Sequence, residues 1–443
     1  MSIVGGRYRH GLRGMPARRA DERHRVATPL ELLFDLTFVA AFGVAGDQLA
    51  HGIAAEHAGP AVIAFIFAMF TVVWAWINVT WFASAFDNDD WLSRLLTMVQ
   101  MTGVTVLAIG LPALFASIEG GGLLDNRVAV AGYVIIRVAV ILQWTRAVRS
   151  NPQYKSLALT YALFVGVAQA GWVALAVLSP RTVAGLTVAS ALFTFEAVGP
   201  VAAERRGERH NGGSTPWHPH HLAERFALLT IIALGETVFG TLASAAVVSR
   251  EQGWTLDAVV VIGTGIAMSF ALWWTYFFVP HASVLTARRD KAVPWGYGHI
   301  VLFSAIAAVG AGLHVVGYAH DPDYDIGGTL VVASVAIPVI VFMIVRDLLQ
   351  AWLVSALPHG GVAQLAVTAL PAIAIALAAG GVPVGVCLLV VLASPVSVIL
   401  SFELGGWRTL DTQLARVLDG ADRTQPPRPP PPPPPREGAS DEV

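Results

Sequence analysis

Long apolar segments of this sequence contain ionisable residues, among them Asp35, Arg137, Glu196 and Glu236. A charge in such surroundings is costly unless it pairs with an opposite charge, is neutralised by a proton or lines a water-filled cavity. With three acids for one arginine, at least one acid is expected to be protonated or to bind a cation. A structural ion pair beside a neutral acid fits the same count. We take the four as candidates for binding a ligand, an ion or a proton.

Glu31 and Asp35 lie at the start of a predicted helix. Thr28, Pro29 and Glu31 form a capping box, in which Thr28 caps the helix and Glu31 reaches back to it. Glu31 therefore has a structural explanation. Asp35 lies one turn further on the same face, and we keep both a functional role and a helix-packing ion pair open for it.

A second helix carries charges along one stripe. At about 100° per residue, His221, Arg225 and Glu236 share a face. Glu236 lies roughly 20 Å along the helix from His221, which places it deep in a membrane. Gly235 beside it is expected to allow another helix to approach closely.

Arg137 is the expected partner for Glu236, and Glu196 competes for the same arginine. Convergence of Asp35, Arg137, Glu196 and Glu236 on one cavity would support transport. Separate helix contacts would remove the main support for it.

Aromatic residues cluster in one further segment, at Trp273, Trp274 and Tyr276. An interfacial belt is the usual reason for such residues near a helix end, and a ligand-facing wall is the alternative. His299 and His314 follow, and both are of the residue type that titrates near neutrality.

Two metal-like motifs are discounted. The run from Trp217 to His221 is rich in histidine but lacks cysteine or acid partners at metal-ligand spacing. The run from Asp321 to Gly327 resembles a calcium loop, but Val332 stands where a bidentate glutamate is needed. No phosphate-binding glycine loop, nucleophile elbow or zinc-protease motif is present. We therefore expect no metal, no cofactor, no catalytic residue and no enzymatic activity.

The composition indicates that these residues are carried by membrane helices. Only 13% of the 443 residues are charged and 55% are apolar, whereas a soluble domain is roughly 25% charged. The net charge of −2 and the lack of a basic stripe exclude a nucleic-acid partner. The single cysteine, Cys387, cannot form an intramolecular disulfide. The sequence predicts an all-α polytopic bundle with the lipid bilayer as its surroundings.

About twenty apolar residues cross a bilayer, and twelve segments meet that requirement. They lie near residues 29–50, 60–82, 92–115, 128–147, 157–178, 183–203, 220–246, 257–280, 297–318, 328–350, 362–379 and 382–403.

Basic residues predict the orientation of these segments. Most of the 28 lysines and arginines fall in the N-terminal tail and in alternate loops, while the opposite loops hold only Arg127, Arg181 and Arg250. The positive-inside rule then predicts that both termini lie in the cytoplasm. The protein is expected in the cytoplasmic membrane of the cell.

The chain is expected to divide into an arginine-rich tail (1–28), a six-helix half (29–204), a cytoplasmic linker (205–219), a second six-helix half (220–404) and a cytoplasmic proline-rich tail (405–443). Pro429 to Pro435 predict a polyproline II spacer. Trp74 and Trp273, with the charges that follow each, recur at similar places in the two halves. This recurrence suggests a parallel repeat of six plus six helices.

The helical segments that carry these candidate residues resemble the low temperature requirement protein A family, a bacterial group of multi-pass membrane proteins. Leu33 and Thr37 depart mildly from the expected pattern. The resemblance spans roughly residues 25–400 and implies that its motif residues do more than local packing, but it implies no substrate. Those residues are Glu31, Phe34, Asp35, His221, Glu224, Arg225, Gly235, Glu236, Trp273, Trp274 and Tyr276.

Two functions follow as hypotheses. The first is an ion-coupled secondary transporter of a small molecule or an ion. The alternative is a non-transporting membrane factor or sensor that acts in growth at low temperature. The sequence does not fix the oligomeric state.

Overall fold

The computed structural model describes residues 14–18, 26–86, 88–209, 213–356 and 361–424. Within these ranges the chain is helical, without a β-strand. Each of the twelve predicted segments is a helix, which confirms the all-α bundle. Except for Arg18, the arginines of the N-terminal tail lie outside the described residues, and so does the run from Pro429 to Pro435.

The helices divide at the loop before residue 219. The first six are α1 (Pro29–Ala54), α2 (Ala58–Phe86), α3 (Trp91–Glu119), α4 (Arg127–Ser150), α5 (Lys155–Leu178) and α6 (Thr182–Arg209). The remainder are α7 (Pro219–Gln252), α8 (Leu256–Tyr276), α9 (His281–Ala287), α10 (Ala292–Tyr318), α11 (Gly328–Val354), α12 (Gly361–Ala379), α13 (Val384–Ser401) and α14 (Trp407–Thr424).

Length and composition identify this bundle as a multi-pass membrane protein. Among the described helices, eleven are long and apolar enough to cross a membrane, and α12 is a shorter apolar helix. Large apolar side chains also face outward along these helices: Ile109, Leu163 and Val183 are 63–80% exposed. Such a surface suits lipid rather than water, because lipid tails solvate apolar side chains and leave the backbone to bond within helices.

The start of α1 forms the predicted cap. The hydroxyl of Thr28 accepts from the backbone N–H of Glu31 at 3.2 Å, and the Glu31 carboxylate accepts from the Thr28 N–H at 2.8 Å. This confirms the capping box. It also fixes the level of Glu31 and Asp35 on the helix.

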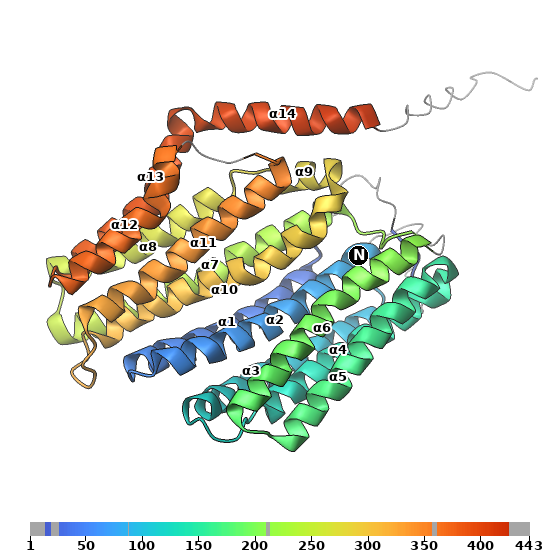
Figure 1. The fold of residues 1–443 in the computed structure, drawn as a ribbon, viewed down its shortest axis with the longest axis horizontal. Coiled ribbons are helices and arrows are strands. Elements are labelled where there is room, and N and C mark those ends of the chain that lie inside the picture. The colour runs from blue at the N-terminus through green and yellow to red at the C-terminus, as the bar shows by residue number, and fades with distance from the viewer. Residues whose placement is uncertain (1–13, 19–25, 87, 210–212, 357–360, 425–443) are drawn as a thin grey trace, which may run out of the picture.

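Helix neighbours follow the same order in the two halves. α1 packs on α2 and α3, α3 on α4 and α5 on α6; correspondingly, α7 packs on α8 and α10, α10 on α11 and α12 on α13. This order is what a parallel repeat would produce, and the repeat itself stays a prediction. The halves meet where α1 and α2 pack against α7 and α10 (Figure 1). We call this contact the seam.

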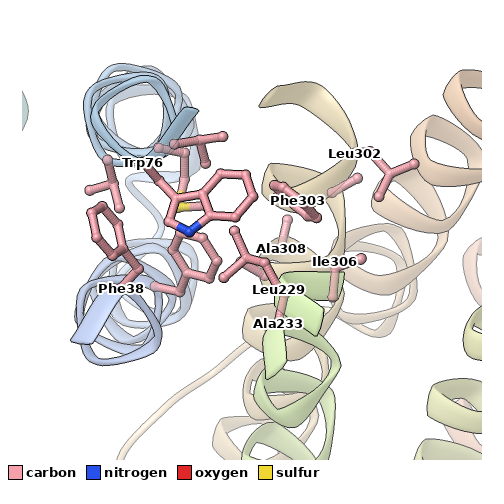
Figure 2. Close-up of a cluster of buried hydrophobic side chains, with 14 of the residues drawn as sticks. Phe38, Trp76, Leu229, Ala233, Leu302, Phe303, Ile306 and Ala308 are labelled. Carbon is pink, nitrogen blue, oxygen red and sulfur yellow. The ribbon is translucent and has the colours of Figure 1, made fainter. Parts of the chain in front are cut away.

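The middle of the seam is filled by apolar side chains. Figure 2 shows Phe38 from α1 and Trp76 from α2 facing Leu229 of α7 and Phe303 and Ile306 of α10. All five are fully buried, each with 0% of its surface exposed. Aromatic and branched side chains from four helices therefore join the halves at this level.

One helix was not predicted. α14 covers residues 407–424 of the segment assigned from sequence to a proline-rich tail. The chain bends at Gly405, whose φ of 147° suits glycine alone, and α14 then runs across the top of the view in Figure 1. Leu410 and Val417 are buried, and α14 packs on α9. The apolar face of α14 therefore docks on the bundle.

Candidate functional site

The first charged cluster joins α1 to α7. Arg225 donates from Nη2 to Oδ1 of Asp35 at 2.5 Å and from Nε to Oδ2 at 3.1 Å. Asp35 is fully buried and Arg225 is 1% exposed. A two-bond arginine–carboxylate pair satisfies both charges and fixes their orientation. Asp35 thus has a structural partner, one that sequence analysis placed on the stripe of α7 without pairing the two.

Glu31 and His221 extend this cluster toward the start of both helices. Oε1 of Glu31 lies 3.0 Å from Nη1 of Arg225 and 2.9 Å from Nε2 of His221. Glu224 lies to the side, where its carboxylate accepts from the backbone N–H of Ala27 at 3.2 Å. The motif residues of α1 and α7 therefore contact one another across the seam. We call Glu31, Asp35, His221 and Arg225 the seam cluster.

A small cavity reaches the seam cluster. It measures about 40 Å³ and is lined by Glu31, Phe34 and Arg225, together with residues of α2, α3 and α4. A cavity of this size holds one or two water molecules. The seam cluster can therefore be hydrated, but it has no room for an organic solute in this conformation.

The second charged cluster lies inside the first half. Arg137 of α4 donates to Oε2 of Glu196 of α6 at 2.6 Å, and both are buried. The hydroxyl of Tyr133 donates to the same oxygen at 2.5 Å and also contacts Arg137. Of the two acids that compete for Arg137, the structure pairs it with Glu196. The expected pairing of Arg137 with Glu236 is wrong.

Indole and amide N–H groups complete the shell around Glu196. Trp74 donates to Oε2 at 2.8 Å, Trp172 donates to Oε1 at 2.9 Å, and Gln169 donates to Oε1 at 3.3 Å. A carboxylate with an arginine and several donors is well satisfied in a dry interior. We call this group the half-one cluster.

Helix α2 stands between the two clusters. The indole of Trp74 serves Glu196, whereas that of Trp76 donates to Oδ1 of Asp35 at 2.6 Å. Two residues along a helix are about 200° apart around its axis, so these indoles point to nearly opposite sides. In the sequence alone, Trp74 stands out only as a marker of the possible repeat. The signal for its role was available, because a buried carboxylate needs N–H donors from neighbouring helices.

Glu236 lies in neither cluster. Its side chain points at α1, with Oε2 placed 3.4 Å from where a Cβ on Gly43 would stand. Among the described residues, no arginine, lysine or histidine forms an ion pair with it, although it is only 9% exposed. The three acids therefore differ in kind: two are paired and one is not.

The close helix approach occurs beside Glu236 but not through the expected glycine. No atom would meet a Cβ on Gly235, so the prediction for that residue is wrong. Instead, a Cβ on Gly310 of α10 would lie 2.5 Å from the backbone oxygen of Glu236. Gly43, Gly310 and Glu236 thus bring α1, α7 and α10 together at one level.

The four candidates consequently do not converge on one cavity, so the convergence that would have supported transport is absent. Asp35 belongs to the seam cluster, Arg137 and Glu196 to the half-one cluster, and Glu236 to the contact of α1, α7 and α10. The count of three acids for one arginine also changes, because Arg225 is buried as deeply as Arg137. One unpaired acid remains rather than two.

The aromatic segment of α8 divides. Trp273 and Trp274 are 38% and 37% exposed, as belt residues would be, whereas Tyr276 is buried and its hydroxyl lies 3.0 Å from Nε2 of His299. Within the described part of the chain, no group of three or more histidine, cysteine, aspartate or glutamate side chains could hold a metal ion. Tyr276 therefore packs inside the bundle, whereas Trp273 and Trp274 face the surroundings of the protein.

Comparisons with known proteins agree with the family resemblance of the sequence. The family model described as bacterial low temperature requirement A protein (LtrA) matches residues 26–395. An uncharacterized protein of Rhizobium meliloti (strain 1021) is 27% identical over 297 residues, which cover 64% of this chain and 67% of that protein. No solved structure matches.

Proposed function

This chain belongs to the bacterial low temperature requirement A family, and from that premise and the geometry above we propose that it is an ion-coupled secondary transporter. Glu236 is the residue that binds the coupling ion. The solute is a small molecule or an ion, and the protein acts on it by transport and not by catalysis.

The unpaired state of Glu236 is the observation that carries this proposal. A carboxyl group in the membrane interior has two ways to avoid an uncompensated charge. It either holds a proton, which makes it neutral, or binds a cation, which balances its negative charge. Such a group binds and releases an ion at little structural cost, because no arginine loses its partner when it does.

The position of Glu236 supports the same reading. It lies where a helix of the first half, α1, meets two helices of the second half, α7 and α10. Binding at this level can therefore bias how the halves pack against each other, which is what coupling an ion to solute movement requires.

The paired acids have a different role in this proposal. The seam cluster and the half-one cluster hold helices together, and their arginines keep their partners throughout. By the distribution of arginines, we propose that the protein lies in the cytoplasmic membrane with the start of α1 and the seam cluster on the cytoplasmic side.

Transport by the purified protein in proteoliposomes tests this function. A panel of amino acids, organic acids, organic cations, sugars and metal ions is offered under a pH gradient and, separately, under a sodium gradient. We expect gradient-driven uptake of at least one compound by the wild type and its loss in Glu236→Gln.

The control is Glu208→Gln, which makes the same chemical change at an exposed site outside both clusters and outside the family motif. It should retain uptake. Failure of the folded wild type to move any compound, or equal uptake by Glu236→Gln, would contradict the proposal.

A further inference from the structure

We propose that the ion bound by Glu236 is a proton and that it enters through Asp47 and His314, from the end of the bundle opposite the seam cluster. This inference rests on the proposed function for its role in coupling. The route itself is argued from the geometry alone.

Asp47 and His314 lie one turn beyond the level of Glu236. Gly43 and Gly310 flank Glu236 on α1 and α10, and Asp47 and His314 each follow four residues later, roughly 6 Å along those helices. Nδ1 of His314 lies 3.3 Å from Oδ1 of Asp47. The two side chains thus bridge α1 and α10 directly above the buried acid.

Exposure rises along this line. Glu236 is 9% exposed, while the side chains of His314 and Asp47 are 22% and 70% exposed. A proton taken from water by Asp47 or His314 would reach the level of Glu236 over about one helical turn. Both groups are of the kinds that exchange protons in water, a carboxylate and an imidazole.

The opposite direction is closed by apolar packing. About 16 Å of α7 separates Arg225 from Glu236, and the buried side chains across that interval include Phe38, Leu229 and Phe303 (Figure 2). We call this the apolar layer. It is as dry as a protein core, and a proton does not cross such a region without polar groups or water.

The hydroxyl groups near the apolar layer offer no path through it. Thr37, Thr230 and Ser304 donate to backbone carbonyls of their own helices, at Phe34, Phe226 and Ile300, over 2.7–2.8 Å. Each hydroxyl is thereby turned back onto its helix. The polar groups of the seam cluster and Glu236 remain separate.

Few other charged groups bear on Glu236. Of the helices packed against α7, α1 contributes Asp47 and α10 contributes His314, while α2 contains no ionisable residue from 58 to 86. The ionisable side chains of α8 and α9, Asp257 and His281 among them, lie at helix ends. Among these groups, Asp47 is the one whose charge interacts electrostatically with Glu236.

Infrared spectroscopy of the full-length protein tests the route without a transport substrate. The C=O stretch of a protonated carboxyl group is assigned to Glu236 by its loss in Glu236→Gln, and its hydrogen–deuterium exchange is followed after transfer to D₂O. The double variant Asp47→Asn with His314→Gln should slow that exchange by roughly a hundredfold, the low end of what a positioned proton-transfer group contributes. Both residues have exposed surface, so the variant is expected to fold.

Two controls sharpen the reading. Glu208→Gln, at an exposed position near the end of α6, should leave the exchange rate unchanged. Titration with sodium or potassium chloride at neutral pH should leave the Glu236 band in place, because the site holds a proton. An exchange rate that the double variant does not alter would overturn the route, and loss of the band on adding either salt would overturn the proton.

The two proposals fail separately. Wild-type protein that moves no solute but exchanges its Glu236 proton through Asp47 and His314 would remove the transport function and keep the route. Solute uptake that needs Glu236 but continues with unaltered exchange in the double variant would remove the route and keep the function.

Discussion

The guanidinium group of Arg225 holds both carboxylate oxygens of Asp35, at 2.5 and 3.1 Å, across the contact between the first helices of the two halves. Both side chains are almost completely buried. The pair is therefore a joint between halves rather than a site open to solute, and it defines what loss of either partner should do.

Asp35→Asn should lower the free energy of unfolding by about 1–3 kcal/mol, because it removes one of the two carboxylates that neutralise buried Arg225 and leaves only Glu31 beside it. Thermal unfolding followed by size-exclusion chromatography measures the loss. The double variant Asp35→Asn with Arg225→Met should recover part of it. Asp89→Asn is the control, since its ion pair with Arg94 is exposed and contributes less than about 1 kcal/mol. Equal losses in Asp35→Asn and Asp89→Asn would show that the seam pair does not join the halves.

The indole donors of the half-one cluster give a second prediction. Trp172→Phe keeps most of the aromatic surface but removes one hydrogen bond to Glu196, which should cost about 1–3 kcal/mol. Trp407→Phe at the exposed start of α14 is the matched control and should be close to neutral. If the two variants unfold at the same temperature, the N–H of Trp172 does not stabilise the buried carboxylate.

The glycines near Glu236 give a third. Gly310→Ala places a methyl group against the backbone of α7 and should cost about 1–3 kcal/mol by overpacking. Gly235→Ala meets no atom and should stabilise its helix by about 0.5–1 kcal/mol. Melting temperatures that move in opposite directions would support the close approach of α7 and α10, and a tolerated Gly310→Ala would contradict it.

Helix α14 gives a fourth prediction. Leu410 is buried against the bundle, so Leu410→Ala should weaken the docking of α14 by about 2 kcal/mol. Limited proteolysis should then cut within residues 407–424 faster than in the wild type. Leu418→Ala, at a residue that is 39% exposed, should leave the cleavage rate nearly unchanged. Unaltered cleavage in Leu410→Ala would mean that this side chain does not hold α14.

The helices could be predicted from the sequence because lipid leaves few alternatives for an apolar segment of twenty residues. The cap at Thr28 could be predicted because its partner, Glu31, is three residues away. The pairing of Arg137 could not, since Glu196 and Glu236 lie 59 and 99 residues from it and only helix packing decides between them. The same limit hid the bond of Asp35 to Arg225, 190 residues away.

Helix α14 was missed for a different reason. Because a proline run follows it, the whole C-terminal segment was predicted to be a proline-rich tail. Yet Leu410, Leu414 and Val417 recur at the spacing of one helical face. That signal was local and could have been used. By contrast, the isolation of Glu236 depends on what every neighbouring helix lacks, which no single segment of sequence reveals.

Thermal unfolding of Asp35→Asn, Glu196→Gln and Glu236→Gln, measured side by side in one detergent, tests most directly the claim that two buried acids serve structure and the third binds an ion. Each substitution replaces a carboxyl group with its neutral amide. The account predicts a loss of about 3–5 kcal/mol for Glu196→Gln, which leaves Arg137 without an opposite charge. It predicts about 1–3 kcal/mol for Asp35→Asn, in which Arg225 keeps Glu31, and no loss for Glu236→Gln. A loss in Glu236→Gln as large as in the other two would contradict it, because Glu236 would then have a structural partner of its own.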